Sequence, residues 1–140
     1  MVQFLVNNNA NAIIKNQVGE TALDAAVKHA AVKHGHGNLL LSNGAVVDAE
    51  DNHGNTPLHW AASLGHHTCT RLLLTHGARV QAENNEGATP LHMATTRGDA
   101  LVVQLLLENG ARHDAKGPDG ETALYWLLYG SGATFRIGPG

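Results

Sequence analysis

Histidine is the residue type with the most chemical potential in this 140-residue chain, which has ten histidines and one cysteine. Neutral imidazole is a common ligand for zinc and other transition metals. Five histidines lie close enough in the sequence to suggest a site: His29, His34, His36, His66 and His67. Neither a cysteine pair nor a carboxylate pattern accompanies them, and spacing alone is weak support for a metal site. We expect no obligate metal, and histidine-based metal binding is the less favoured alternative to a solvated histidine loop.

Nucleophilic catalysis is the second chemistry that the residue types allow. No serine lies in a Gly-x-Ser-x-Gly elbow, and no glycine-rich phosphate loop follows a predicted strand. Cys69 lies 33 residues before Val102 in a matching stretch of sequence, which favours a small core residue over a reactive thiol. We therefore expect neither enzymatic activity nor a cofactor.

His59 and His92 belong to a stretch that recurs along the chain. The sequence Thr56-Pro57-Leu58-His59 returns 33 residues later as Thr89-Pro90-Leu91-His92, and related stretches begin at Thr21 and Thr122. A fixed period of this length is typical of a repeat array. The threonine can cap a helix, the proline suits the first helical turn, and a histidine three residues after the threonine can bond back to it. These two histidines therefore have a predicted structural role.

Glycines recur with the same period, at places where a tight turn or a helix end needs a positive φ. Four lie two residues before a threonine of the recurring stretch, and two lie nine residues after one. The other three precede an alanine at the end of the second helix that we predict in a unit. The nine positions are Gly19, Gly54, Gly87, Gly120, Gly65, Gly98, Gly44, Gly77 and Gly110.

Taken together, these features resemble the ankyrin repeat. The shared pattern is Gly, one residue, Thr-Pro-Leu-His, one residue, Ala, then a Gly, an apolar helix ending in Leu-Leu-Leu, and Gly-Ala. The resemblance implies an all-α fold, a solenoid of stacked helix-turn-helix repeats joined by β-turn fingers. It also implies a non-catalytic scaffold that binds a partner protein.

We expect a single ankyrin-repeat domain over 1–140. Its units are a half repeat at 1–15, an irregular repeat with a two-residue insertion at 16–50, full repeats at 51–83 and 84–116, and an incomplete C-terminal repeat at 117–140. In the irregular repeat, the run at 25–29 is repeated at once, which predicts a first helix lengthened to about Lys33 and a loop near 34–37. Asp99 is the predicted cap of a second helix.

Composition narrows the setting and the partner. The chain is 43% apolar, 15% charged and 4% aromatic, which fits one compact domain whose helices stack through small residues. A net charge of −3 with nine scattered basic residues argues against nucleic acid as a partner. No run predicts a membrane span, and the first residues lack the basic start of a signal peptide. A single cysteine excludes an intramolecular disulfide and favours a cytoplasmic or nuclear location.

The resemblance places the partner on the finger tips and on the exposed side of each first helix. The corresponding residues are Lys28, His29, Asn52, His53, Asn55, Trp60, Ser63, Leu64, Asn85, Glu86, Met93, Thr96, Arg97, Asp119, Glu121, Trp126 and Tyr129. Trp60, Met93 and Trp126 share one position, where they either border this surface or pack between repeats. Acidic finger residues favour a mildly basic partner, and these are Glu50, Asp51, Glu83, Glu86, Asp119 and Glu121.

An alternative function stays open at this point. The array could be a regulatory ankyrin module of a larger enzyme, channel or transcriptional regulator, in which it acts on an adjacent domain instead of a separate chain. The half units expected at both ends fit that interpretation.

Overall fold

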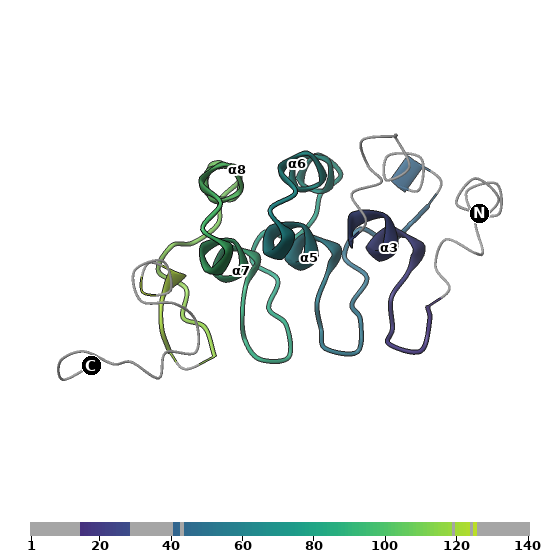
Figure 1. Ribbon diagram of the computed structural model, residues 1–140, viewed down its shortest axis with the longest axis horizontal. Helices are drawn as coiled ribbons and strands as arrows, with labels where there is room; N and C mark the ends of the chain where they lie inside the picture. The colour runs from purple at the N-terminus through teal and green to yellow at the C-terminus, as the bar shows by residue number, and fades with distance from the viewer. Residues whose placement is uncertain (1–14, 29–40, 43, 119, 124, 126–140) are drawn as a thin grey trace.

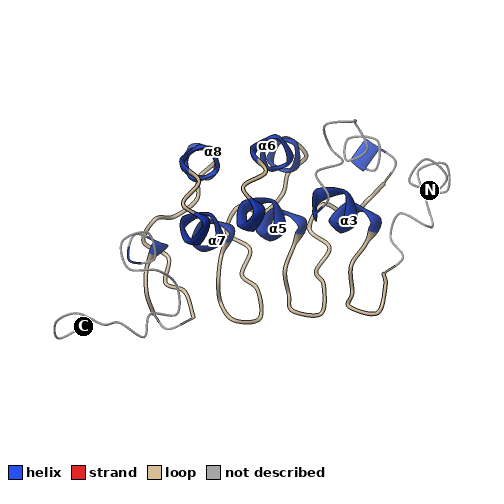
Figure 2. Ribbon diagram, viewed as in Figure 1, coloured by secondary structure: helices blue, strands red, loops and turns tan. Residues whose placement is uncertain are grey.

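The computed structural model describes residues 15–28, 41, 42, 44–118, 120–123 and 125 (Figure 1). Five helices are bounded within these residues: α3 (Ala22–Lys28), α5 (Pro57–Leu64), α6 (His67–Thr75), α7 (Pro90–Arg97) and α8 (Ala100–Glu108). The described part of the chain contains no strand, and an isolated bridge joins Lys116 to Thr122 (Figure 2). The expectation of an all-helical chain is therefore confirmed for the described residues.

The helices form two rows (Figure 1). Helices α3, α5 and α7 lie side by side in chain order, and α6 and α8 lie side by side above α5 and α7. The loops that precede the first-row helices project to the other side of that row. Helices α5 and α7 therefore each have an outer helix on one side and a loop on the other.

The first-row helices begin where the threonines predict. Thr56 precedes α5 and accepts a hydrogen bond from the His59 backbone N–H, while the His59 side chain accepts one from the Thr56 backbone N–H. Thr89 and His92 form the same reciprocal pair at the start of α7. In the second row, Asp99 caps the start of α8, where its side chain accepts hydrogen bonds from the backbone N–H groups of Leu101 and Val102. Both predicted kinds of cap are confirmed.

The chain reverses at the glycines that the period picks out. All nine have a positive φ: Gly19, Gly44, Gly54, Gly65, Gly77, Gly87, Gly98, Gly110 and Gly120. Gly65, for example, ends α5 with φ 71°, and its N–H donates to the carbonyl groups of Ala61 and Ala62. The turn into α6 follows directly, so the two helices of the unit pack antiparallel within a few residues.

The core consists of aligned apolar side chains from successive units. Leu23, Leu58 and Leu91 hold one position in α3, α5 and α7, and all three are buried. Ala61 and Ala94 are fully buried where neighbouring first-row helices meet, because a methyl group lets the helices approach closely. In the second row, Cys69 and Leu73 of α6 match Val102 and Leu106 of α8, and all four are buried. The sequence prediction that Cys69 is a core residue is confirmed.

Several expectations fall on residues outside the described ones. The half repeat at 1–15, apart from Lys15, is among them, as are the extension of the first helix beyond Lys28 and the loop near 34–37. The same holds for His29, Asp119, Trp126 and Tyr129 and for the tail at 130–140.

Candidate protein-binding surface

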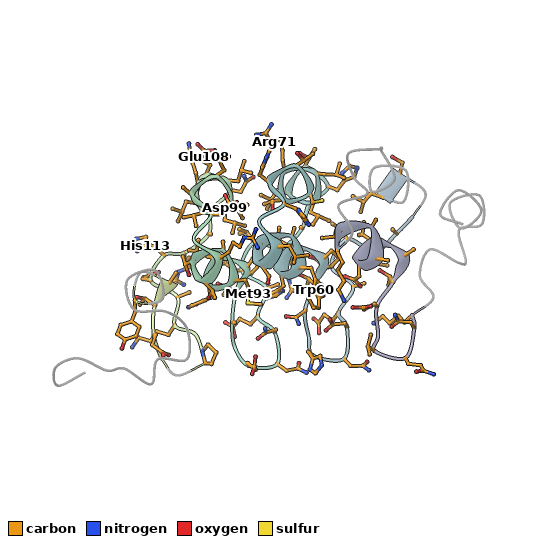
Figure 3. All side chains as sticks on the ribbon, in the orientation of Figure 1. Trp60, Arg71, Met93, Asp99, Glu108 and His113 are labelled. Atoms are coloured by element: carbon orange, nitrogen blue, oxygen red, sulfur yellow. The ribbon has the colours of Figure 1, made fainter. Side chains whose placement is uncertain are left out.

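The candidate surface combines the loops below the first row with the side of α5 and α7 that faces them. Trp60 and Met93 lie on this side, whereas Arg71 and Glu108 lie on the outer row (Figure 3). We call the loops at 16–20, 51–55, 84–88 and 117–121 the finger loops. Among the predicted contact residues, those exposed are Asn52, His53, Asn85, Glu86, Thr96 and Arg97, and those half-buried are Lys28, Asn55, Trp60, Ser63, Leu64 and Met93.

Three of the finger loops are held by a side-chain acceptor at their first residue, which is Asn16, Asp51 or Asn84. The Asp51 carboxylate accepts from the backbone N–H groups of His53 and Asn55, at 2.9 and 3.0 Å. The Asn84 side chain does the same for Glu86 and Ala88, both at 3.0 Å. Such bonds fix the backbone of a turn before any partner arrives. The loops are therefore preorganised, and binding to them needs little ordering of the backbone.

Neighbouring finger loops are also bonded to one another. The Asn52 N–H donates to the Val18 carbonyl and the Asn85 N–H to the His53 carbonyl, both at 2.9 Å. The side-chain amides of the same two asparagines donate to the carbonyls of Gln17 and Asn52, at 3.0 and 3.1 Å. Asn52 and Asn85 are exposed, yet their amide groups already hold the loops together.

Two acidic residues do not lie where the sequence analysis placed them. Asp51 is only 8% exposed, because its carboxylate points inward to hold its own loop and to accept from Trp60 Nε1 at 3.1 Å. Glu121 is 6% exposed, and its carboxylate has no hydrogen-bond partner among the described residues. The two carboxylates are therefore buried, and the expectation that they add to the acidic charge of the fingers at exposed sites is wrong. Glu86 within a finger loop, and Glu50 and Glu83 directly before two of the loops, are exposed acidic residues.

Trp60 is covered by a lysine from the preceding helix. The Lys28 ammonium lies 4.2 Å from the centre of the Trp60 ring and forms an ion pair with Glu20. The hydrogen bond from Lys28 lowers the pKa of Glu20 below its usual value. An ammonium over an indole ring is an attractive pair. Trp60 therefore borders the surface with one face occupied by the protein itself.

The matching position one unit later is open. A groove of about 430 Å³ lies at this position, and seven residues line it: Ser63, Glu86, Ala88, Met93, Thr96, Arg97 and Pro118. Met93 is the counterpart of Trp60, and Ser63 is the counterpart of Lys28. A short hydroxymethyl group replaces the long lysine side chain, so the groove remains unfilled.

His59 and His92 are fully buried inside the first row. In each, Nδ1 accepts from the cap threonine, while Nε2 lies 2.9 Å from the Ala88 carbonyl or 3.2 Å from the Glu121 carbonyl. Nε2 therefore carries the proton of a neutral ring. Burial lowers the pKa of both histidines, which keeps them neutral. Both ring nitrogens are engaged in hydrogen bonds, so neither histidine is free to bind a metal.

The remaining histidines do not form a metal site in the described part of the chain. His66 and His67 are adjacent at the start of α6, and desolvation lowers the pKa of His66. No group of three or more histidine, cysteine or acidic side chains is placed to bind an ion among the described residues. His34 and His36 lie outside them.

Asp24 occupies the histidine position in α3. It is fully buried, and one carboxylate oxygen accepts from the Thr21 backbone N–H at 3.0 Å. The other oxygen, Oδ1, has no partner among the described residues. Burial raises the pKa of this carboxyl group from 3.8 to about 6. Asp24 therefore accepts the cap N–H as the histidines do, but it has no N–H group that could donate to the carbonyl of the next finger loop.

Sequence reasoning missed two features of the surface, the Lys28 cover on Trp60 and the open groove over Met93. The residue seven positions after the cap threonine does change from Lys28 to Ser63 and Thr96, but only the structure shows that this position faces the next unit. The described helices include none that is both long and apolar enough to cross a membrane.

Comparison with known proteins agrees with this geometry. A family model described as ankyrin repeats, in three copies, matches residues 28–117. A search of curated proteins finds no match. The matched residues make up more than half of the chain and contain α5, α7 and α8 with their caps, seven of the nine positive-φ glycines and the finger loops at 51–55 and 84–88. The chain belongs to the ankyrin repeat family.

Proposed function

We propose that this chain is a non-catalytic interaction module that binds a partner protein through its finger loops and first-row helices. In this proposal the paired helices form a solenoid, and the finger loops with their β-turns extend its binding side. The single cysteine of the chain, which is buried, fits a cytoplasmic or nuclear setting.

The observation that carries the proposal is the groove over Met93. The other polar groups of this side are mostly engaged within the protein: Asp51 holds its loop, Asn85 bonds the preceding loop, and Lys28 covers Trp60. The groove, by contrast, has an apolar floor with Glu86 and Arg97 at its edges, and no described side chain fills it. An apolar site with a few charged groups around it is typical of a binding surface.

The partner that fits this surface is mildly basic. Glu50, Glu83 and Glu86 are exposed along the fingers, and Lys15 and Lys116 are the lysines near them. Exposed charges of this kind mainly change the association rate and the choice of partner.

A charge-reversal pair tests the proposed surface. Thr96→Lys with Glu86→Lys places two basic groups on the groove, and Thr68→Lys with Glu108→Lys makes the same exchanges on the exposed side of the outer row. We expect the first pair to abolish capture of the partner from lysate, quantified by mass spectrometry, and the second pair to leave it unchanged. Circular dichroism checks that both proteins are folded. Equal capture by the two variants would reject this surface.

A further inference from the structure

The same helix position has opposite roles in two successive units. Lys28 and Ser63 both lie seven residues after a cap threonine, and each faces the residue four positions after the next threonine. Lys28 faces Trp60, and its ammonium lies 4.2 Å from the ring centre. Ser63 lines a groove with Met93 and does not fill it. The protein thus contains one filled and one empty version of the same groove.

The filled version shows what the groove accepts. The lysine stem crosses from α3 towards α5, and its ammonium reaches the Glu20 carboxylate. Long lysine stems commonly lie along apolar surface while the charged end stays near water or an acid. The first groove is therefore a site for a lysine side chain, supplied from within the chain.

The empty version also has an apolar floor and an acid, but its acid is Glu86 from the next finger loop, because Asn55 occupies the position of Glu20. Met93 offers a flexible apolar floor in place of the indole. Glu86 lines the same groove, is exposed, and has no ion pair or hydrogen bond from its carboxylate to any described residue. An acid in this position can receive an ammonium group from outside.

The positive charge of Arg97 does not cancel this preference. Arg97 Nε and Asp99 Oδ2 lie 3.2 and 2.9 Å from the point that a Cβ atom on Gly65 would occupy, so both groups border Gly65, although they form no ion pair with each other. The Asp99 charge offsets that of Arg97 at this end of the groove. An acidic ligand in the groove would have to approach Glu86.

We propose that the groove formed by Ser63, Met93 and Glu86 binds a lysine side chain of the partner protein, which lies over Met93 as Lys28 lies over Trp60. The lysine stem packs on Met93 and its ammonium pairs with Glu86. This inference rests on the proposed function and specifies which side chain of the partner enters the surface.

Peptide pools with one fixed central residue test the inference. Four pools carry Lys, Arg, Gln or Glu at the centre, with all flanking positions randomised, and the retention of each on immobilised protein is measured at physiological salt. We expect the lysine pool to be retained about fivefold better than the glutamine pool, as a solvent-accessible ion pair with apolar packing provides. The preference should exceed that for arginine, because the occupant that the protein itself uses is lysine.

Two variants and a matched control locate the binding. Ser63→Lys fills the groove from within the chain and should remove the lysine preference, and Glu86→Gln should reduce it severalfold. Thr68→Lys adds the same charge on the exposed side of α6 and should leave the preference unchanged. Because Glu86 is exposed, we expect Glu86→Gln to fold normally. This variant therefore still tests the inference if Ser63→Lys fails to fold.

Three results would overturn the inference: equal retention of the pools, preference for another central residue, or a lysine preference that survives Ser63→Lys. None of these would by itself reject the proposed function. The Thr96 and Glu86 exchange to lysine tests whether the surface captures any basic partner, whichever side chain enters the groove.

Discussion

The Nε2 atom of His59 lies 2.9 Å from the carbonyl oxygen of Ala88, in the finger loop of the following unit. The same imidazole accepts the Thr56 N–H through Nδ1, at 3.1 Å. One buried side chain therefore completes the start of α5 and fixes the loop that leads into α7. His92 repeats the arrangement towards the Glu121 carbonyl. Neighbouring units are joined by a polar bond as well as by apolar packing.

Replacing His59 with leucine should destabilise the protein strongly. The change removes the acceptor of the buried Thr56 N–H and the donor to Ala88, and the loss of a cap and of buried hydrogen bonds costs about 3 kcal/mol. Urea unfolding followed by circular dichroism measures the free energy of unfolding. His53→Ala, at an exposed finger position, is the control and should change it by less than about 0.5 kcal/mol. Similar losses in both variants would contradict the role given to His59.

Two glycine-to-alanine exchanges should differ in cost although both glycines have a positive φ. Gly54 has φ 76° and Gly77 has φ 85°. A Cβ atom on Gly54 would meet Asn85 Oδ1 and would lie 2.8 Å from the Asn85 backbone nitrogen, whereas one on Gly77 would meet nothing within 4 Å. Gly77→Ala should cost about 1 kcal/mol from backbone strain alone. Gly54→Ala should cost at least twice as much by urea unfolding, because the next finger loop must also move. Equal costs would show that the loops are not in close contact.

Cys69 should be unreactive in the folded protein. Its side chain is buried in the second row, and desolvation raises the pKa of the thiol to about 11. The thiolate is the reactive form, so both its access and its abundance are low at neutral pH. We expect labelling with a chromogenic disulfide reagent to occur on the timescale of unfolding in buffer and within seconds in denaturant. Rapid labelling of the folded protein would contradict the burial of α6 against its neighbours.

Features that depend on local spacing were predictable from the sequence. The threonine caps, the paired histidines and the nine turn glycines each need a particular residue type at one position, so the period reveals them directly. Asp99 as a cap and Cys69 as a core residue follow from alignment between units. The family comparison confirms the resemblance on which the fold was predicted.

Features that depend on where a side chain points were not predictable. Asp51 and Glu86 are both acidic finger residues, but Asp51 folds back onto its own loop and Glu86 does not. Lys28 and Trp60 are 32 residues apart, and only the distance between α3 and α5 shows that they meet. Spacing within a unit fixes which residues share a face, whereas contacts between units depend on side-chain length and on the neighbour.

Asp24→His should stabilise the protein at pH 7.5. The introduced imidazole can accept the Thr21 N–H through Nδ1 and donate through Nε2 to the Asn55 carbonyl, the counterpart of Ala88. It also removes a buried carboxylate, whose raised pKa of about 6 corresponds to a cost on the order of 3 kcal/mol at this pH. We expect a gain of about 2 kcal/mol in urea unfolding, since the new ring must also fit. Asp114→His, at an exposed site, should produce a change within about 0.5 kcal/mol.

The pH dependence of unfolding should distinguish Asp24 from the histidines by sign. The folded pKa of Asp24 is raised, so its contribution to stability is present below about pH 3.8 and is lost as the pH rises to about 6. The folded pKa values of His59 and His92 are lowered, so their contribution is present above about pH 6.5 and is lost as the pH falls below it. In the wild type, Asp24 and the two histidines therefore change the unfolding free energy in opposite directions between about pH 3.8 and 6.5. Asp24→His removes the loss of stability with rising pH that Asp24 causes, and adds a third buried histidine, whose contribution grows with pH. The difference in unfolding free energy, variant minus wild type, should therefore rise steadily from pH 4 to pH 7. The difference should be negative at the acid end, where a protonated carboxyl group is tolerated and a buried imidazolium is not. Urea unfolding at half-unit pH steps measures it, and a flat difference would show that Asp24 is not titrating inside the first row.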